Sequence, residues 1–160
     1  MTRIVTVGAA QLGPINREHD RAAVVERLIA LLRQGAQQGC DLVVFPELAL
    51  TTFFPRWFVQ DITEFDHYYE RSMPNAATQP LFDEAKRLGI GFCLGYALLA
   101  EDGRRWNVQT LVEKDGRIVA TFKKVHIPGH EHHEPDRPFQ HAERYYFEPS
   151  PDGFGVWRAF

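Results

Sequence analysis

The segment Asp41–Leu48 reads DLVVFPEL and predicts a buried parallel strand that is followed directly by a carboxylate. Its apolar, β-branched residues are typical of a strand that is covered on both faces. Pro46 has no N–H group to donate to a sheet ladder, so we expect the strand to end there. In open α/β sheets, ligands bind outside the carboxyl ends of the strands. Glu47 is therefore a candidate general base, and a helix-capping carboxylate at this position is the alternative.

Two adjacent lysines stand at a similar strand end much later in the chain. Asp115-Gly116 lies between two apolar runs and predicts a β-hairpin. The second strand of that hairpin ends at Lys123-Lys124, before a Pro-Gly turn. Successive strand residues point to opposite faces, so one lysine can turn inward while the other is solvated. In the alternative interpretation, both are solvated lysines that discourage edge-to-edge pairing of the sheet.

Strands and helices alternate in the first part of the chain and are followed by hairpins. The predicted helices cover 16–38, 58–70 and 78–88, and the predicted strands cover 4–10, 41–46, 90–100, 111–114 and 117–122. Asn16 is the expected N-cap of the first helix, and Gly89 is the expected C-cap of the last. This order indicates a single α/β domain over residues 1–160, with a sheet of mixed strand directions.

Composition and charge argue against several classes of function. The chain of 160 residues has a formal net charge of -3, which gives no electrostatic reason to bind nucleic acid or an anionic membrane. Its two cysteines can form at most one disulfide, and no apolar run approaches the length of a membrane span. The N-terminal apolar stretch is too short for a signal peptide. We therefore expect a cytoplasmic protein.

A tract rich in histidine raises the alternative of a metal-binding module. Its histidines and acidic residues are His126, His130, Glu131, His132, His133 and Glu134. Histidine and carboxylate side chains are zinc ligands. The spacing matches no standard zinc motif, however, and Pro128-Gly129 argues against a helix that would align His126 with His130. We interpret His132 and His133 as parts of a solvated loop and expect no metal.

Several segments together resemble one family. FPEL at 45–48 and KVHIPGH at 124–130 are specific in combination, and further matching segments lie at 7–15, 88–92 and 146–149. The chain resembles the N-terminal half of the nitrilase superfamily, the carbon-nitrogen hydrolases. TTFFPRW at 51–57 and RPFQH at 137–141 favour the branch of the N-carbamoyl-D-amino acid amidohydrolases. The resemblance implies a nitrilase-like four-layer αββα sandwich, of which this chain would supply about half, with apolar sheet surface left uncovered.

The resemblance also implies hydrolysis by a Glu-Lys-Cys triad. Residue by residue, Glu47 matches the general base, and Lys124 matches the cation that stabilises the oxyanion. His126, His141 and Glu143 match residues that line the substrate pocket. The expected substrate is an N-carbamoyl-D-amino acid, which would give a D-amino acid, ammonia and carbon dioxide without a metal or an organic cofactor. The complete protein is expected to form a homo-oligomer.

The nucleophilic cysteine of that triad is not expected within these residues, because the resemblance places it on a strand beyond Phe160. Cys40 lies at a predicted helix-to-strand turn and Cys93 in an apolar strand, so we interpret both as small hydrophobic residues. We therefore expect residues 1–160 to be a truncated domain that is inactive by itself. Two alternatives are another amidase of the superfamily and a catalytically dead fragment that serves as an interaction partner.

Overall fold

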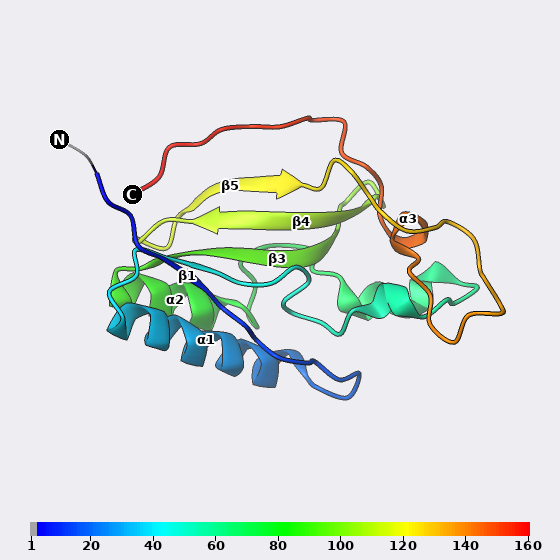
Figure 1. Cartoon of the computed structure of the whole chain (residues 1–160), viewed down its shortest axis with the longest axis horizontal. Helices are drawn as coiled ribbons and strands as arrows, with labels where there is room; N and C mark the ends of the chain where they lie inside the picture. The colour runs from blue at the N-terminus through cyan, green and yellow to red at the C-terminus, as the bar shows by residue number, and fades with distance from the viewer. Residues whose placement is uncertain (1–2) are drawn as a thin grey trace.

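The computed structural model describes residues 3–160, in which a five-stranded sheet packs against a pair of helices (Figure 1). The strands are β1 (Val7–Ala9), β2 (Leu42–Val44), β3 (Gly91–Leu99), β4 (Arg105–Val112) and β5 (Ile118–Lys123). The α-helices are α1 (Arg21–Gln37), α2 (Gln79–Leu88) and the short α3 (Glu143–Tyr146), and two 3₁₀ segments are η1 (Phe54–Arg56) and η2 (Ile62–Tyr68). The strands follow one another across the sheet in chain order. β1 to β3 run parallel, whereas β4 and β5 pair antiparallel with their neighbours. This mixed α/β sheet confirms the predicted fold class.

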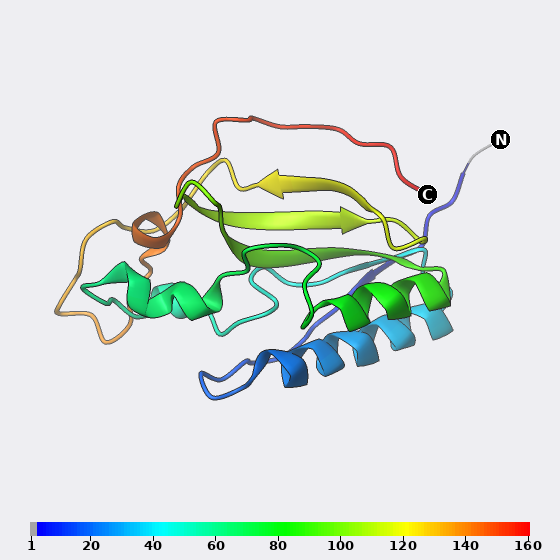
Figure 2. The same ribbon diagram turned by 180° about the vertical axis from the view of Figure 1, so that it is seen from behind.

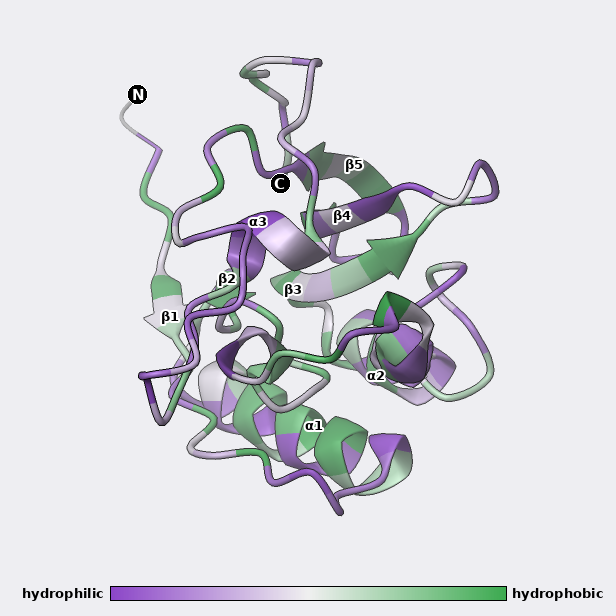
Figure 3. Ribbon diagram, turned by 90° about the vertical axis from the view of Figure 1, so that its right-hand side faces the viewer, coloured by the Kyte–Doolittle hydropathy of each residue, from purple (hydrophilic) through white to green (hydrophobic). Residues whose placement is uncertain are grey.

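α1 and α2 lie side by side beneath the sheet in both views of the ribbon (Figures 1 and 2). Buried apolar residues recur along α1 at helical spacing, and these are Val24, Val25, Leu28, Ile29 and Leu32. Figure 3 shows green, hydrophobic stretches of α1 with purple, hydrophilic residues between them. From α2, Phe82 packs edge-on against Phe92 of β3, with 5.1 Å between ring centroids. The helices thereby cover one face of the sheet.

The opposite face of the sheet is partly bordered by the C-terminal segment 148–160, drawn in red beside β5 in Figure 1. Phe122 of β5 stacks on Phe154 and meets Trp157 edge-on. The large apolar side chains that stay exposed are Ile4, Val5, Val7, Phe53, Phe139, Phe154, Val156 and Trp157. Exposed apolar side chains therefore lie at the β1 edge and on segment 154–157, of which only Val7 belongs to the sheet. In the part of the chain that the structure describes, no helix has the length and apolar character to cross a bilayer.

A cluster of aromatic rings fastens the segment after β2 to α3. The ring of Phe54, which is fully buried, lies at its centre. The rings around it, 5.1 to 5.9 Å away between centroids, belong to Phe65, Tyr68, Tyr69, Tyr146 and Phe147. Aromatic pairs at these separations add to the free energy gained from burial. Two segments far apart in the sequence are therefore held together beside the sheet.

Two of the predicted helices differ from the structure. The first helix begins at Arg21 rather than near Asn16, because Asp20 accepts a hydrogen bond from the N–H of Ala23 at 2.7 Å and caps it. Residues 58–70 form no α-helix and instead contain the 3₁₀ segment η2. A helix with three residues per turn aligns side chains at i and i+3. Phe65 and Tyr68 can therefore both reach Phe54.

The predicted glycine positions at the ends of two elements are confirmed, whereas several predicted strand bounds are not. Gly89 follows α2 with a φ of 64°, in the left-handed region that closes a helix. Asp115-Gly116 lies in the turn of the β4–β5 hairpin, where Gly116 has a φ of 84°. The first strand covers only Val7–Ala9, less than the predicted 4–10. Local turn chemistry thus located the boundaries better than hydrophobic length did.

The cap assignment predicts a difference between two neighbouring substitutions. Asp20→Ala should lower the free energy of unfolding by about 1 kcal/mol, because an N–H group at the start of α1 loses its acceptor. Asn16→Ala should change it by less than about 0.5 kcal/mol. Urea denaturation of both variants measures the two values. Equal losses would show that Asp20 is not the cap.

Candidate active site

Glu47 projects from a turn that interrupts the pairing of β2 with β3. The N–H of Phe45 donates to the carbonyl of Cys93, and that of Ala49 donates to Gly95. Pro46 cannot donate between them. Residues 47–50 form turns rather than a helix, so Glu47 is not a helix cap. Glu47 thus lies beyond the carboxyl end of β2, as predicted, but the strand ends at Val44 rather than at Pro46.

The turn that carries Glu47 packs directly against the backbone of Gly95 in β3. A Cβ atom at position 95 would lie 2.7 Å from the carbonyl oxygen of Pro46 and 2.9 Å from Cα of Glu47. Both distances are too short for unbonded atoms, and both neighbours are backbone atoms that cannot rotate away. The absence of a side chain at position 95 therefore lets the turn approach the sheet.

The ammonium group of Lys124 connects two carboxylates. Its Nζ donates to Oε1 of Glu47 at 2.6 Å and to Oε2 of Glu143 at 2.8 Å. On the far side of Glu143, Nε2 of His141 lies 3.1 Å from Oε1. Glu143 is 2 % exposed, so the contacts with Lys124 and His141 offset the cost of burying its carboxylate. Residues from the β2 end, the β5 end and α3 meet in one chain of polar contacts.

Asn107 of β4 is a further member of this cluster. Its Nδ2 donates to Oε1 of Glu47 at 2.5 Å, and it is 4 % exposed. The sequence reasoning did not single it out. It lies before the predicted strand 111–114, whereas β4 begins at Arg105, so the sequence pattern did not place it in the sheet.

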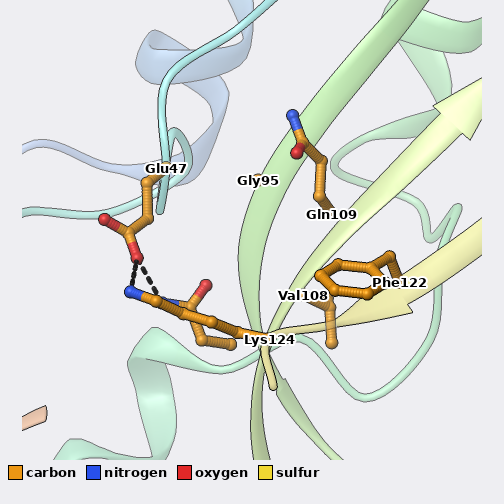
Figure 4. A pocket seen from close by; sticks show the side chains of 7 residues that line it. Glu47, Gly95, Val108, Gln109, Phe122 and Lys124 are labelled. Carbon is orange, nitrogen blue, oxygen red and sulfur yellow. Dashed lines mark hydrogen bonds and ion pairs between the residues drawn. The ribbon is translucent and has the colours of Figure 1, made fainter. Parts of the chain in front are cut away.

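The cluster borders a cavity of about 240 Å³ on the sheet face opposite the helices (Figure 4). The residues that line it are Glu47, Gly95, Asn107, Val108, Gln109, Phe122 and Lys124. In Figure 4 the carboxylate of Glu47 points toward Lys124, while Gln109 and Phe122 lie on the other side of the hollow. A carboxylate and an ammonium group thus face a space where a small group can bind.

The pKa of Lys124 is raised above its ordinary value. Burial lowers the pKa of this ammonium group, but hydrogen bonds to Glu143 and Glu47 and their negative charges outweigh that effect. Lys124 is therefore a cation at neutral pH. A cation held in place before a reaction starts is suited to stabilise a developing negative charge.

The two adjacent lysines have different partners, as predicted from strand alternation. Lys123 contacts Asp152 at 3.0 Å and lies over the ring of Trp106, at 4.9 Å from its centroid. Lys124 turns to Glu47 and Glu143. Neither is the freely solvated edge lysine of the alternative interpretation.

Of the predicted pocket residues, His141 and Glu143 join the cluster and His126 does not. The ring of His126 lies 5.8 Å from that of Phe154. His126 lines a separate cavity together with Glu131 and Arg144. Its assignment to the substrate pocket stays a prediction that rests on the resemblance.

Neither cysteine lines the cavity beside Glu47. Cys40 is half-buried close to Gly8, at the junction of α1 and β1. Cys93 is half-buried in β3, and burial raises the pKa of its thiol. A raised pKa leaves less of the nucleophilic thiolate. Both cysteines are thus placed as packing residues rather than as nucleophiles of this cluster.

The histidine tract makes contacts of its own. Nδ1 of His130 lies 2.6 Å from the carbonyl oxygen of His132, and the N–H of His141 donates to Nε2 of His130 at 3.0 Å. The ring of His133 stacks on Phe58 at 4.7 Å. Within residues 3–160, no three histidine, cysteine or acidic side chains are grouped closely enough to hold a metal ion. The metal-binding alternative therefore gains no support.

The close contact at Gly95 predicts a loss of stability on adding a methyl group. Gly95→Ala should lower the free energy of unfolding by about 1–3 kcal/mol, because the Pro46–Leu48 turn must move away from β3. Gln109→Ala, on the strand position that pairs with Gly95, is the exposed control and should cost less than about 0.5 kcal/mol. Urea denaturation gives both values, and an unchanged Gly95→Ala variant would contradict the packing described.

The raised pKa of Lys124 predicts a pH dependence of stability. A group that binds its proton more tightly in the folded state stabilises that state fully below its unfolded pKa, and this contribution is lost as the pH rises through the folded pKa. From about pH 10 upward, the unfolding free energy of the wild type should fall more steeply than that of Lys124→Met. Urea denaturation at pH 8 and pH 11 tests this. Parallel curves would show that the ion pairs add nothing.

Comparison with known proteins places this geometry in a family. The sequence model of the family "Carbon-nitrogen hydrolase" matches residues 6–158. The chain is 27% identical over 104 residues to the omega-amidase NIT2 of Homo sapiens, which covers 64% of this chain and 34% of the relative. It is 30% identical over 132 residues to an arylacetone-specific nitrilase of Alcaligenes faecalis, covering 77% of this chain and 35% of the relative. The chain thus spans about a third of the length of these relatives.

A solved structure shows the same fold. The crystal structure of a carbon-nitrogen hydrolase from Helicobacter pylori G27 matches with a TM-score of 0.71 and 23% sequence identity, over 94% of this chain and 46% of that chain. The relatives include omega-amidases and nitrilases, so the narrower likeness to N-carbamoyl-D-amino acid amidohydrolases remains an inference from segments 51–57 and 137–141. The family itself is established: the chain belongs to the carbon-nitrogen hydrolases.

Proposed function

We propose that Glu47 and Lys124 are the general base and the oxyanion-stabilising cation of a hydrolase that cleaves a carbon-nitrogen bond with a cysteine thiol. The observation that carries this proposal is the contact of Lys124 Nζ with Glu47 Oε1 at 2.6 Å, beside a cavity of about 240 Å³. Cys40 and Cys93 lie away from that cavity. The thiol therefore comes from residues outside these 160.

The proposed reaction assigns each group one task. Glu47 takes the proton of the thiol, and the thiolate attacks the carbonyl carbon of the substrate. Lys124 stabilises the negative oxygen of the tetrahedral intermediate. As the intermediate collapses, the carbon-nitrogen bond breaks, and Glu47 returns its proton to the departing amine or ammonia. Glu47 then takes a proton from water, which attacks the thioester and releases the acid and the free thiol.

For the substrate we infer an N-carbamoyl-D-amino acid. The two segments that favour this branch lie against each other: the N–H of Gln140 donates to the carbonyl of Arg56, and the guanidinium group of Arg56 lies over Phe139 at 4.2 Å. Phe53 lies 6.1 Å from the ring of His141, which contacts Glu143. These segments thus border the cluster, where they can contact a substrate. Attack on the carbamoyl carbon would release ammonia, and water would then free carbon dioxide and the D-amino acid.

Amides and nitriles form a second candidate class of substrate. The relatives named as an omega-amidase and a nitrilase favour them. The same base and cation serve either carbonyl or nitrile carbon, because both develop negative charge on the atom next to the one attacked. Cytoplasmic location and homo-oligomerisation of the complete protein stay predictions from the sequence.

The test uses the full-length protein encoded by the reading frame that contains this chain. Glu47→Gln and Lys124→Met should each lower kcat by at least about 1,000-fold, because each removes a charge needed in the transition state. Lys123→Met is the matched control, since Lys123 pairs with Asp152 outside the cluster, and it should keep activity within about threefold. Ammonia release from N-carbamoyl-D-amino acids, their L-enantiomers, aliphatic amides and nitriles measures turnover.

The outcomes of this experiment are distinct. Loss in both cluster variants, with activity kept in Lys123→Met, supports the roles assigned to Glu47 and Lys124. Wild-type turnover in Glu47→Gln or Lys124→Met would refute them. The 160 residues expressed alone should release no ammonia from any of these substrates, and turnover by that chain would show that no outside thiol is needed.

A further inference from the structure

A single residue of β4 contacts both members of the proposed base–cation pair. The side chain of Asn107 donates from Nδ2 to Oε1 of Glu47 at 2.5 Å. Its backbone carbonyl accepts a hydrogen bond from the N–H of Lys124 at 2.8 Å. Asn107 is 4 % exposed and is the third residue of β4, where it pairs with Ala97 of β3 on one side and is bonded to the Lys124 backbone on the other. It therefore connects Glu47 and Lys124 through a rigid part of the sheet.

Both donors reach the same oxygen of Glu47. Lys124 Nζ and Asn107 Nδ2 lie 2.6 Å and 2.5 Å from Oε1. An oxygen of an ionised carboxylate has about two lone-pair sites, so these two donors fill Oε1. Among residues 3–160, no group donates to Oε2, and Figure 4 shows this second oxygen directed away from Lys124. Oε2 is thus the oxygen that is free to take a proton.

We propose that Asn107 is a positioning residue that holds Oε1 of Glu47, so that Oε2 is presented to the attacking thiol. This proposal rests on the proposed function, in which Glu47 is the base. The amide orientation follows from chemistry, since the Oδ1 of asparagine would repel a carboxylate oxygen at this distance. Asn107 lines the cavity, but its side-chain amide is bonded to the base, so we expect it to act on the geometry of proton transfer.

Asn107 is a second donor to Glu47, in addition to Lys124, and there is a physical reason for having both. Lys124 has three N–H donors, of which two are used by Glu47 and Glu143, and its side chain has four rotatable carbon–carbon bonds. When the ammonium group shifts toward a developing oxyanion, its contact with Glu47 weakens. Asn107 has a short side chain on a paired strand and keeps Oε1 in place at that moment. A neutral amide does this without placing another full charge beside the base.

The test compares Asn107→Leu with Asn107→Asp in the full-length protein. The charged groups near position 107 are Glu47 and Lys124, and Glu143 lies beyond Lys124. At neutral pH both variants should lower kcat by about 10- to 100-fold, because a base displaced by about 1 Å transfers protons poorly. KM should stay within about threefold, since the side-chain amide of Asn107 is taken up by Glu47.

The pH profile separates positioning from packing. As the pH falls, an aspartic acid at position 107 gains a proton and can donate it to Oε1, so Asn107→Asp should recover activity on the acid side. Asn107→Leu has no donor at any pH and should keep the wild-type profile at a lower level. Asn16→Asp, before α1, is the control for added surface charge. Equal losses with identical pH profiles in the two Asn107 variants would show a merely structural residue and overturn the proposal.

Failure of this inference can be told from failure of the proposed function. If Glu47→Gln abolishes turnover while both Asn107 variants keep the wild-type kcat, the positioning role is wrong and the base assignment stands. If Glu47→Gln is fully active, the base assignment fails. A measurement without turnover completes the test: the side-chain amide ¹⁵N–¹H resonances of Asn107 should shift in Glu47→Gln, and unchanged resonances would contradict the hydrogen bond.

Discussion

The ammonium group of Lys124 lies between the carboxylates of Glu47 and Glu143, and the surrounding segments are arranged to keep it there. Burying a charge without a partner costs several kcal/mol, and this cost falls on Glu143, since the side chains of Lys124 and Glu47 are 28% and 45% exposed. Glu143, at 2 % exposure, depends on this contact most strongly. The requirement brings together the end of β2, the end of β5 and α3, which are far apart in the sequence.

The sheet and the aromatic cluster satisfy that requirement from two sides. Gly95 of β3 leaves room for the turn that carries Glu47, and Asn107 of β4 donates a hydrogen bond to the Glu47 carboxylate. On the other side, the rings around Phe54 hold α3, and with it Glu143, against the segment that follows Glu47. Apolar packing therefore supplies the rigidity, and the polar groups at its border supply the chemistry. This division is common where a reactive site must be pre-organised.

Sequence reasoning found the parts of the site that have a local signature. Glu47 follows a buried strand and a proline, and Lys124 ends a hairpin strand, so both could be named as candidates before any geometry was known. His141 and Glu143 came from the family resemblance. Asn107 was missed because it lies before the predicted strand 111–114, and nothing in its neighbours marks an asparagine that binds a carboxylate. The cap of α1 was misplaced because Asn16 and Asp20 are equally good caps by residue type.

The sequence by itself determined the α/β order of elements, the hairpin at Asp115-Gly116 and the family, because the hydrophobic period, the turn residues and the motifs each lie in contiguous residues. Only the tertiary structure decided which oxygen of Glu47 is occupied, that Gly95 and Asn107 hold it, and that His126 lies apart from His141. Those facts depend on distances between residues up to 77 positions apart. Such distances arise from the packing of the whole chain, and no local pattern encodes them.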